Sequence, residues 1–406
     1  MALPGATETL SSISGENEIA SFKMNGQLIE GASLTMPEGN ATITEITFVR
    51  YLYDEITAQN QENGEMVLDN EASTYVSAST GIDFAVAPSD TNGKGVYVRN
   101  GTESDAYPVY YYRGAVTNNN VIFGGFCWKI VRTTETGGIK LIYNGTPSNG
   151  TCNNTGEASQ IGTSAFNTEV HDNAYVGYMY GNFTPPTDCF ETPDGLSCDD
   201  GGSTSYNEAH LSTKESTSST IKTIIDTWYS QNMTSYTGYL EDTIWCNDRS
   251  FASSNTGPGA GTSETYYGAY GRVGYGAGSN PQPSLECVNQ NDRFTVNETM
   301  EGRTTGNGAL TYPVALLTAD ELTLAGNGKQ VYLSSSYLTT GEYWWSLSPY
   351  YFSGGYALGV EVRYGGLLDI YTVDNSYGAR PAVSLILGTE ISKNGDGSAE
   401  SPFVVE

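Results

Sequence analysis

The feature that most limits the fold of this chain is the alternation of apolar and polar residues near its C-terminus, over residues 343–385. Leu358, Val360 and Val362 alternate with polar neighbours, which predicts a strand with one buried face. A closing strand is expected over residues 379–387. The residues that we expect to form the scaffold are Trp344, Trp345, Leu347, Pro349, Leu358, Val360, Val362, Val373, Arg380, Pro381, Val383 and Leu385. Among them Arg380 is expected to be buried and paired with an acid.

A second set of residues in the same stretch has the composition of a binding surface. It is rich in Tyr, Ser, Gly and Asn, as an antibody paratope is, where Tyr supplies a large contact area at low entropic cost. The residues that we expect to contact a ligand are Tyr350, Tyr351, Ser353, Gly354, Gly355, Tyr356, Arg363, Tyr364, Gly366, Leu368, Asp369, Tyr371, Asn375 and Tyr377. An ordinary β-rich C-terminus with aromatic strand residues is the alternative explanation.

The order of the motifs in this stretch resembles a known family. WWSLSP, a Tyr/Ser/Gly cluster, ALGVEV, a second cluster and GARPAVSL are similar to the C-type-lectin-fold variable proteins of diversity-generating retroelements. In that family an adenine-directed copying step rewrites chosen codons, many of them Asn codons. Such rewriting cannot give Glu, Lys, Gln, Met or Trp, and from residue 346 to residue 385 only Glu361 belongs to that set. The resemblance extends back to about Phe123 and does not cover about the first 80 residues.

The resemblance implies both a fold and a function. The fold is α+β, an elaborated C-type-lectin-like fold with long loop insertions, related to the formylglycine-generating-enzyme-like fold. The function is that of a hypervariable receptor or adhesin, extracellular, on a bacterial cell surface or a phage particle. Its partner would be a protein or glycan ligand on another cell or virus. Two alternatives stay open: a structural subunit of a fibre, pilus or phage tail, and an enzyme on the same fold.

The charge of the chain limits its partners. It has 46 acidic and 18 basic residues, a net charge of -28. Nucleic acids and anionic membranes select basic surfaces, so we expect neither as a partner. No run approaches the roughly 18 apolar residues of a membrane span. The N-terminal residues MALPGATETL have no signal-peptide pattern, so we expect an export signal and any anchor to lie outside this sequence.

The cysteines favour an oxidising compartment. Six are present, and none forms a C-x-x-C pair. Three disulfides are therefore the favoured interpretation, although six cysteines allow 15 pairings. Pairing of nearest neighbours is expected, because each bond would then close one loop-rich insertion. The expected pairs are Cys127 with Cys152, Cys189 with Cys198, and Cys246 with Cys287.

Composition divides the chain into two parts. Residues 1–80 are expected to form an N-terminal supporting region, and residues 81–406 the ligand-binding domain. Gly, Ser, Thr and Asn dominate two stretches, at about residues 144–216 and 252–310, which predicts long surface insertions.

Capping signals predict several helices. Thr42 and Glu45 form a capping-box pattern before apolar residues at helical spacing, which predicts a helix over 43–58. Thr318 and Glu321 repeat the pattern and predict a short helix.

Three further local signals follow from single residues. Ser218 is expected to cap a helix that carries Ile221, Ile224, Ile225 and Trp228. Gly326 is expected to end the short helix after Thr318. The Gly137–Gly138 pair predicts a hairpin between strands over 121–133 and 139–143.

Catalysis has little support in the residues. Only two histidines are present, His171 and His210, and neither lies beside a nucleophile in a catalytic motif. Formylglycine-generating enzymes need cysteines in their C-terminal part, and no Cys follows Cys287. Acids are plentiful, so a glycosidase pair stays open, but no pair stands out. We therefore predict no catalytic residue and no enzyme.

A metal site is a separate question. The EPN and QPD triplets of calcium-dependent sugar-binding lectins are absent. Asn394, Asp396, Ser398 and Glu400 place oxygen atoms at alternate positions, which leaves a structural calcium ion open although the rest of a calcium loop is missing. No other cofactor is expected.

Overall fold

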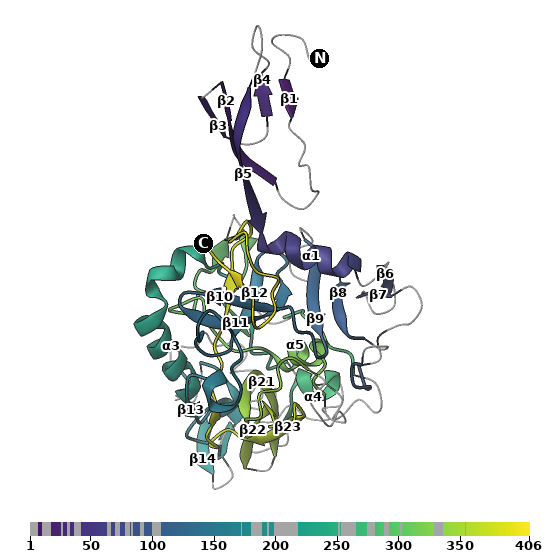
Figure 1. Cartoon of the computed structure of the whole chain (residues 1–406). Helices are drawn as coiled ribbons and strands as arrows, with labels where there is room; N and C mark the ends of the chain where they lie inside the picture. Colours follow the sequence, from purple (N-terminus) through teal and green to yellow (C-terminus); the bar gives the residue numbers. More distant parts are fainter. Residues whose placement is uncertain are drawn as a thin grey trace.

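The computed structural model describes most of the chain. The described residues are 7–9, 18–25, 27–30, 33–35, 42–62, 66–69, 74–77, 82, 84–89, 93–99, 107–171, 173–179, 189–192, 195–198, 218–250, 252, 265–273, 281–287, 292–300, 303–328, 336–353 and 355–406. Sheets dominate and short helices lie among them (Figure 1), so the predicted α+β class is confirmed.

A nine-stranded sheet forms the centre of the body. Its order is β25-β12-β11-β9-β8-β7-β6, with β10 on β11 and β27 on β10. The bounds are β6 (Met66–Asp69), β7 (Thr74–Ser77), β8 (Gly95–Arg99), β9 (Val109–Arg113), β10 (Asn120–Phe123), β11 (Phe126–Thr133), β12 (Ile139–Tyr143), β25 (Ala382–Leu385) and β27 (Phe403–Val404).

The hairpin predicted at Gly137–Gly138 is confirmed as β11 and β12, with Gly137 at a φ of 85°. The predicted strand over 121–133 is two strands, because Gly124 and Gly125 both adopt positive φ and turn the chain between β10 and β11.

A second, six-stranded sheet carries the stretch on which the sequence analysis centred. Its order is β13-β24-β21-β22-β23, and β17 also pairs with β21. The bounds are β13 (Thr163–Ser164), β17 (Thr265–Tyr266), β21 (Trp344–Ser353), β22 (Tyr356–Val362), β23 (Leu368–Thr372) and β24 (Tyr377–Gly378). Strands β13 and β17 come from the two segments predicted as insertions, so parts of both segments are integral to this sheet.

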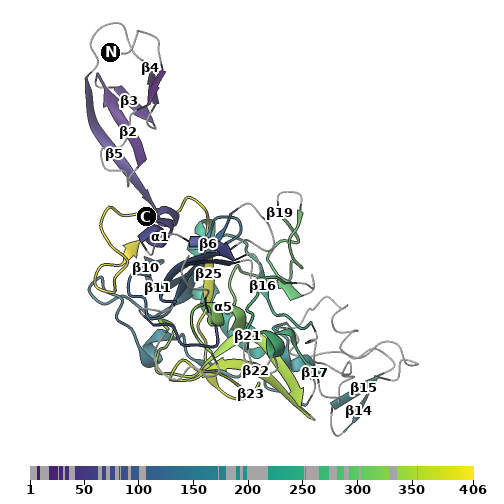
Figure 2. The ribbon, with the colours of Figure 1, turned by 90° about the vertical axis from the view of Figure 1, so that its right-hand side faces the viewer.

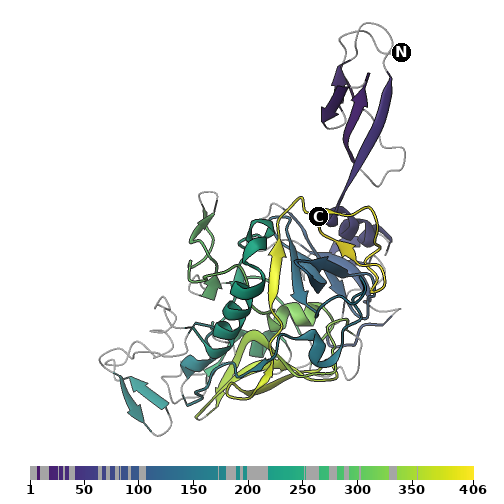
Figure 3. The same cartoon turned by 60° about the vertical axis from the view of Figure 1, so that its left-hand side comes forward.

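An elongated arm rises from the body. It contains the pair β1 (Thr7–Thr9) and β4 (Ser33–Thr35) and a sheet of β3 (Gln27–Glu30), β2 (Glu18–Met24) and β5 (Ile43–Tyr51). The end of β5 pairs with β26 (Glu390–Ile391) of the body. In Figures 1, 2 and 3 the arm lies at one end of the molecule and β21–β23 lie at the other.

The helix predicted over 43–58 is wrong in its first half. Residues 43–51 form β5, and only then does α1 (Leu52–Glu62) begin. The nine residues ITEITFVRY are mostly β-branched or aromatic, and pairing with β2 satisfies their backbone. The Thr42 N–H, expected in a capping box, donates to Asn25 Oδ1 at 2.8 Å.

The arm ends at residue 51 and the body begins with α1, whereas the sequence predicted the boundary between the two parts at residue 80. Leu52 and Ile56 of α1 are fully buried in the core of the body. Strands β6 and β7 then extend the central sheet from β8.

The remaining elements are short. They are α3 (Thr220–Asn232), α4 (Gly268–Arg272), α5 (Ala319–Leu324), η1 (Gly156–Ser159), η2 (Asn173–Val176), η3 (Thr234–Tyr239), β14 (Cys189–Thr192), β15 (Gly195–Cys198), β16 (Trp245–Cys246), β18 (Arg293–Phe294), β19 (Thr299–Met300) and β20 (Arg303–Thr304). The N-cap of α3 is Ser219, whose hydroxyl accepts from the Lys222 N–H, and not Ser218. Of the apolar residues predicted on α3, Ile224 is 39% exposed, so it lies outside the buried stripe.

The second capping box is confirmed. Thr318 accepts from the Glu321 N–H at 3.1 Å, and the Glu321 carboxylate accepts from the Thr318 N–H at 3.0 Å. Gly326, at a φ of 101°, follows the end of α5 as predicted.

Two of the predicted disulfides are confirmed: Cys127 with Cys152, and Cys246 with Cys287. Their Cα atoms lie 5.6 and 5.7 Å apart. The side chains of Cys189 and Cys198 lie outside the described part. The backbone of the β14–β15 hairpin places these two residues opposite each other.

The scaffold prediction agrees with burial for every residue except Leu358, which is half-buried. Arg380 is fully buried as expected, but its partners differ. Its guanidinium donates to the carbonyl oxygens of Tyr143 and Leu338 and to Asn144 Oδ1, all at 3.1 to 3.2 Å. It also lies 4.7 Å from the ring centre of Trp344. The charge of Arg380 is therefore stabilised by carbonyl and amide oxygens and by the Trp344 ring, and not by the acid that was expected.

Helices are too short to span a membrane: among the described residues none has the length and apolarity that a bilayer crossing needs.

Candidate ligand-binding site

The residues predicted to contact a ligand differ widely in exposure. Tyr356, Tyr364 and Tyr371 are 50%, 60% and 48% exposed. The half-buried ones are Tyr351, Arg363, Asp369, Asn375 and Tyr377, and the buried ones are Tyr350, Gly355, Gly366 and Leu368. Gly354 and the side chain of Ser353 lie outside the described residues.

Two of the predicted contact residues are therefore corrected to supporting roles. Tyr350 is 1% exposed, and its ring lies 5.2 Å from that of Tyr270. Leu368 is 2% exposed and lies opposite Val362 on the core face of the sheet. The reasons differ: Tyr350 lies at a register shift between β21 and β22 and packs on Tyr270 of α4, whereas Leu368 points into the core with Val362.

The pleat also divides the predicted surface into two parts. Glu361 of β22 lies opposite Asp369 of β23, so their side chains share one face. Leu358 lies opposite Tyr351, on the face of the apolar alternation. The sequence predicted one continuous patch, whereas the sheet presents Asp369 and Tyr351 on different faces.

The first part is a cluster of aromatic and charged side chains around the face that carries Glu361 and Asp369, and we name this cluster the cup. We define the cup as Tyr343, Glu361, Arg363, Asp369, Tyr371 and Tyr377. The Tyr377 ring stacks on Tyr343 at 5.3 Å and meets Tyr371 edge-on at 5.8 Å. Trp345, fully buried, lies 5.0 Å below the Tyr377 ring and donates from Nε1 to the Ser164 carbonyl at 3.0 Å. The hydrogen bond and the burial of Trp345 therefore fix the position of the ring on which Tyr377 packs.

An ion pair forms the rim of the cup. Arg363 Nη1 lies 2.8 Å from Asp369 Oδ2, and the guanidinium lies 5.7 Å from the ring centre of Tyr343. A hydrogen bond to Tyr343 and the neighbouring carboxylates raise the pKa of Arg363. The rim charges are half-exposed, so water screens their attraction.

Glu361 lies at the bottom of the cup. It is 1% exposed, and among the described residues its Oε2 atom has no hydrogen-bond partner. Burial first, and then the charge of Asp369, raise the pKa of this carboxyl from 4.5 to about 7, although Arg363 opposes the shift. Burial and the charge of Glu361 also raise the pKa of Tyr377.

The second part is the Tyr351 cluster, which we define as Tyr266, Tyr270, Tyr350 and Tyr351. The Tyr266 and Tyr351 rings stack at 5.0 Å with an angle of 6° between their planes. Tyr266 also lies 4.4 Å from Tyr270. Thus β17, far away in the sequence, extends the aromatic surface of β21.

A histidine supports the hairpin between β21 and β22. His171 Nδ1 lies 2.8 Å from the Gly355 carbonyl oxygen, and its ring lies 5.4 Å from that of Tyr356. Gly355 adopts a φ of 125°, which L side chains rarely adopt.

Sequence reasoning missed several members of these two groups. Tyr343 was detectable, because it lies immediately before β21 and two positions before Trp345, a spacing at which extended residues share a face. The sequence alternation predicted that Glu361 points away from the face of Val360 and Val362, but it did not predict Glu361 as a contact residue. Tyr266, Tyr270 and His171 carry no local signal, since only the pairing of distant segments brings them to this sheet.

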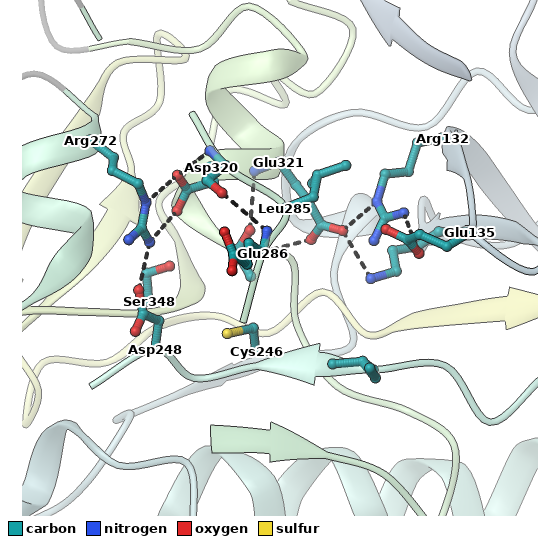
Figure 4. Close-up of a pocket in the computed structure, with 14 residues that line it drawn as sticks. Arg132, Glu135, Cys246, Asp248, Arg272, Leu285, Glu286, Asp320, Glu321 and Ser348 are labelled. Carbon is teal, nitrogen blue, oxygen red and sulfur yellow. Dashed lines mark hydrogen bonds and ion pairs between the residues drawn. The ribbon is translucent and has the colours of Figure 1, made fainter. Parts of the chain in front are cut away.

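A separate charged pocket lies between the two sheets (Figure 4). Arg132 and Lys140 bind Glu321 Oε1 at 2.8 and 2.9 Å. On the other side Arg272 binds Asp320 and Asp248, both at 2.8 Å. The room between them is about 30 Å³, which suits one or two water molecules.

The electrostatics of this pocket fit a structural network. Burial alone would raise the pKa of Glu321, but the charges of Lys140 and Arg132 hold it at about 2. The carboxylate is thus fixed in its charged form, and it also caps α5. Four acids of the pocket, Glu135, Asp248, Asp320 and Glu321, each bind arginine or lysine.

The loop of residues 394–400, whose alternating oxygen atoms left a structural calcium ion open, lies beside an arginine that binds carbonyl oxygens of residues 392–395. Arg50 Nη1 donates to the carbonyl oxygens of Ser392, Lys393 and Gly395 at 3.1 to 3.3 Å. Asp396 Oδ1 accepts from the Ser398 N–H at 2.9 Å. Among the described residues no group of three or more His, Cys, Asp or Glu side chains is placed to hold a metal ion.

No protein-family model, no curated protein and no solved structure matches this chain. The function has to be argued from the geometry of the site itself.

Proposed function

We propose that this protein is a surface-displayed receptor or adhesin that binds its ligand through the cup and the neighbouring exposed tyrosines. The observation that carries the proposal is the contrast between contact residues and scaffold in one sheet. Tyr364 and Tyr371 are 60% and 48% exposed, while Trp344 and Trp345 of the same sheet are fully buried. Clustered, half-exposed tyrosines are typical anchors of protein interfaces.

The same contrast supports the resemblance to variable proteins on a C-type-lectin-like fold. Residues such as Tyr356, Tyr364 and Asn375 contribute little to the core, so their replacement costs little stability. The buried Trp345 is held by the Ser164 carbonyl and by packing on Phe166, and would be replaced only at high cost. Such a sheet tolerates variation at its contact positions while it keeps its shape.

The arm supports display at a surface. It is joined to the end of the body opposite β21–β23 (Figure 1), so a chain tethered through the arm would present the cup outward. The disulfides at Cys127–Cys152 and Cys246–Cys287 support an oxidising, extracellular location on a bacterium or phage particle.

The test uses full-length protein and peptides selected on it from a displayed random library. Replacing Tyr364 and Tyr371 by Ala should weaken binding of the selected peptides at least about tenfold, equivalent to about 1.4 kcal/mol. Tyr239→Ala is the matched control, because Tyr239 is 42% exposed and lies on η3, outside both clusters. Undiminished affinity in a folded double variant would refute the proposed site.

Population sequencing is an independent test. Substitutions should concentrate at the codons for the exposed and half-exposed contact positions, such as Tyr356, Tyr364, Tyr371 and Asn375, while Trp344 and Trp345 stay fixed. An equally invariant sequence over both groups would instead favour one fixed partner or a structural subunit, and sedimentation of the purified protein would then detect assembly.

A further inference from the structure

Glu361 is the one acid of the cup that is buried without a partner for one of its oxygens. Its side chain is 1% exposed, and Oε2 accepts no hydrogen bond from any described residue. A buried acceptor that is left unsatisfied costs about 1 to 3 kcal/mol, and more when it is charged. An apolar residue at this position would avoid that cost, so stability of the fold does not explain why a carboxylate is present.

We propose that Glu361 is the counter-ion for a cationic group of the ligand, and that the cup binds a lysine or arginine side chain of a protein. This inference rests on the proposed function, and it adds the chemical class of the ligand group. The ammonium or guanidinium would donate to Oε2, and the rings of Tyr371 and Tyr377 would contact its alkyl stem.

The charge balance of the cup favours a cation. Glu361 and Asp369 carry two negative charges when ionised, and Arg363 carries one positive charge, so the cup has a net charge of -1. The ion pair that the structure describes in the cup joins Arg363 to Asp369, at 2.8 Å, and Glu361 forms no ion pair with any described residue. The whole chain, at -28, also attracts cationic partners over longer distances.

The aromatic walls favour a cation as well. The rings of Tyr343, Tyr371 and Tyr377 form one cluster, the charge of Glu361 acts on Tyr377, and the Arg363 guanidinium already lies 5.7 Å from the ring centre of Tyr343. A cation within about 6 Å of such a ring gains about 0.5 to 2 kcal/mol. Neutral sugars would use the hydrogen-bonding capacity of Glu361 but not the charge of the cup, so they are the less favoured ligand.

A ligand would reach the carboxylate by movement of the exposed side chains on this face. The side chains of Arg363 and Asp369 are 40% and 24% exposed, and Tyr371 is 48% exposed, whereas Trp345, opposite Glu361 on β21, is fully buried. Rotation of exposed side chains takes nanoseconds or less and needs no change in the backbone.

The experiment compares peptide selection on the full-length wild type and on Glu361→Gln, which keeps the size of the side chain and removes its charge. Glu157→Gln is the matched control, because Glu157 is an exposed acid on η1, outside both clusters. Wild type and control should enrich peptides that contain lysine or arginine. In these peptides, arginine to citrulline or lysine to norleucine should weaken binding at least about tenfold. Glu361→Gln should bind the basic peptides about tenfold more weakly and should not distinguish them from the neutral analogues.

The other outcomes separate the two proposals. Peptides that need Tyr364 and Tyr371 but carry no basic residue, or that bind Glu361→Gln as tightly as wild type, would overturn this inference and leave the proposed function intact. Binding of neutral glycans that depends on Glu361 would overturn the assignment to lysine or arginine. An absence of peptides that depend on these tyrosines would refute the proposed function and this inference with it.

Discussion

Glu361 also determines how the stability of the protein should change with pH. Burial in the cup, assisted by Asp369, raises the pKa of its carboxyl from 4.5 to about 7. Between these two values the folded state binds a proton more tightly than the unfolded state does. The contribution of Glu361 to the free energy of unfolding is therefore greatest below about pH 4.5, and it is lost as the pH rises to about 7.

The size of the effect follows from the shift. One pKa unit corresponds to about 1.4 kcal/mol, so a rise from 4.5 to about 7 corresponds to roughly 3 kcal/mol as an upper value. Glu361→Gln removes this dependence and keeps the shape of the side chain. We expect the variant to match wild type at about pH 4.5 and to be more stable by about 2 to 3 kcal/mol at about pH 8.

Urea denaturation followed by tryptophan fluorescence would measure the difference, because Trp345 lies in the strand that pairs with Glu361. Comparison of the two proteins at each pH cancels the contributions of other buried acids. Glu157→Gln, at an exposed position of η1, reports the general effect of removing one negative charge. A difference between wild type and Glu361→Gln that is the same at both pH values, or a wild type that is the more stable at about pH 8, would refute the reasoning.

Three further predictions concern the scaffold. Arg50→Ala removes three hydrogen bonds to carbonyl oxygens of residues 392–395. Limited proteolysis should therefore cleave the variant faster at the junction of arm and body, while the melting temperature of the body is unchanged. An unchanged cleavage pattern would contradict this prediction. Glu321→Gln leaves Lys140 buried without its counter-ion and should lower the free energy of unfolding by about 3 to 5 kcal/mol at neutral pH. Because the pKa of Glu321 is held at about 2, its contribution to the free energy of unfolding is present above about pH 4.5, and acidification should remove it from wild type but not from Glu321→Gln. A variant that is less stable than wild type by under about 1 kcal/mol at neutral pH would contradict the network. Replacing Cys246 and Cys287 by Ser opens a loop of 41 residues and should cost about 4 kcal/mol in chemical denaturation, and an unchanged midpoint would contradict this.

Local signals in the sequence were sufficient for several elements. The Gly137 turn, the capping box at Thr318 and the alternation through Val360 each depend on residues only a few positions apart. Backbone conformation and side-chain direction over such a short distance follow from the residues themselves. The two described disulfides were also predictable, since each closes one loop-rich segment.

Other features depend on which distant segments meet. Residues 43–51 form a strand because β2 lies beside them, and this pairing overrides the helical spacing of their apolar residues. Tyr350 was expected at the surface, but α4 covers it and Tyr270 contacts its ring.

The sequence by itself determined most of the scaffold positions in residues 343–385, because large apolar side chains such as Trp344, Trp345 and Val360 are the ones that folding buries. It determined the exposed positions only in part, since Tyr350 and Leu368 are buried. Only the tertiary structure decided the shape of the candidate site. It stacked Tyr266 on Tyr351, placed Tyr371 on the other face of the sheet, and left Glu361 beneath the rings of the cup. Burial and charge balance at a position depend on every segment that packs around it, and those contacts are made between residues that lie far apart in the chain.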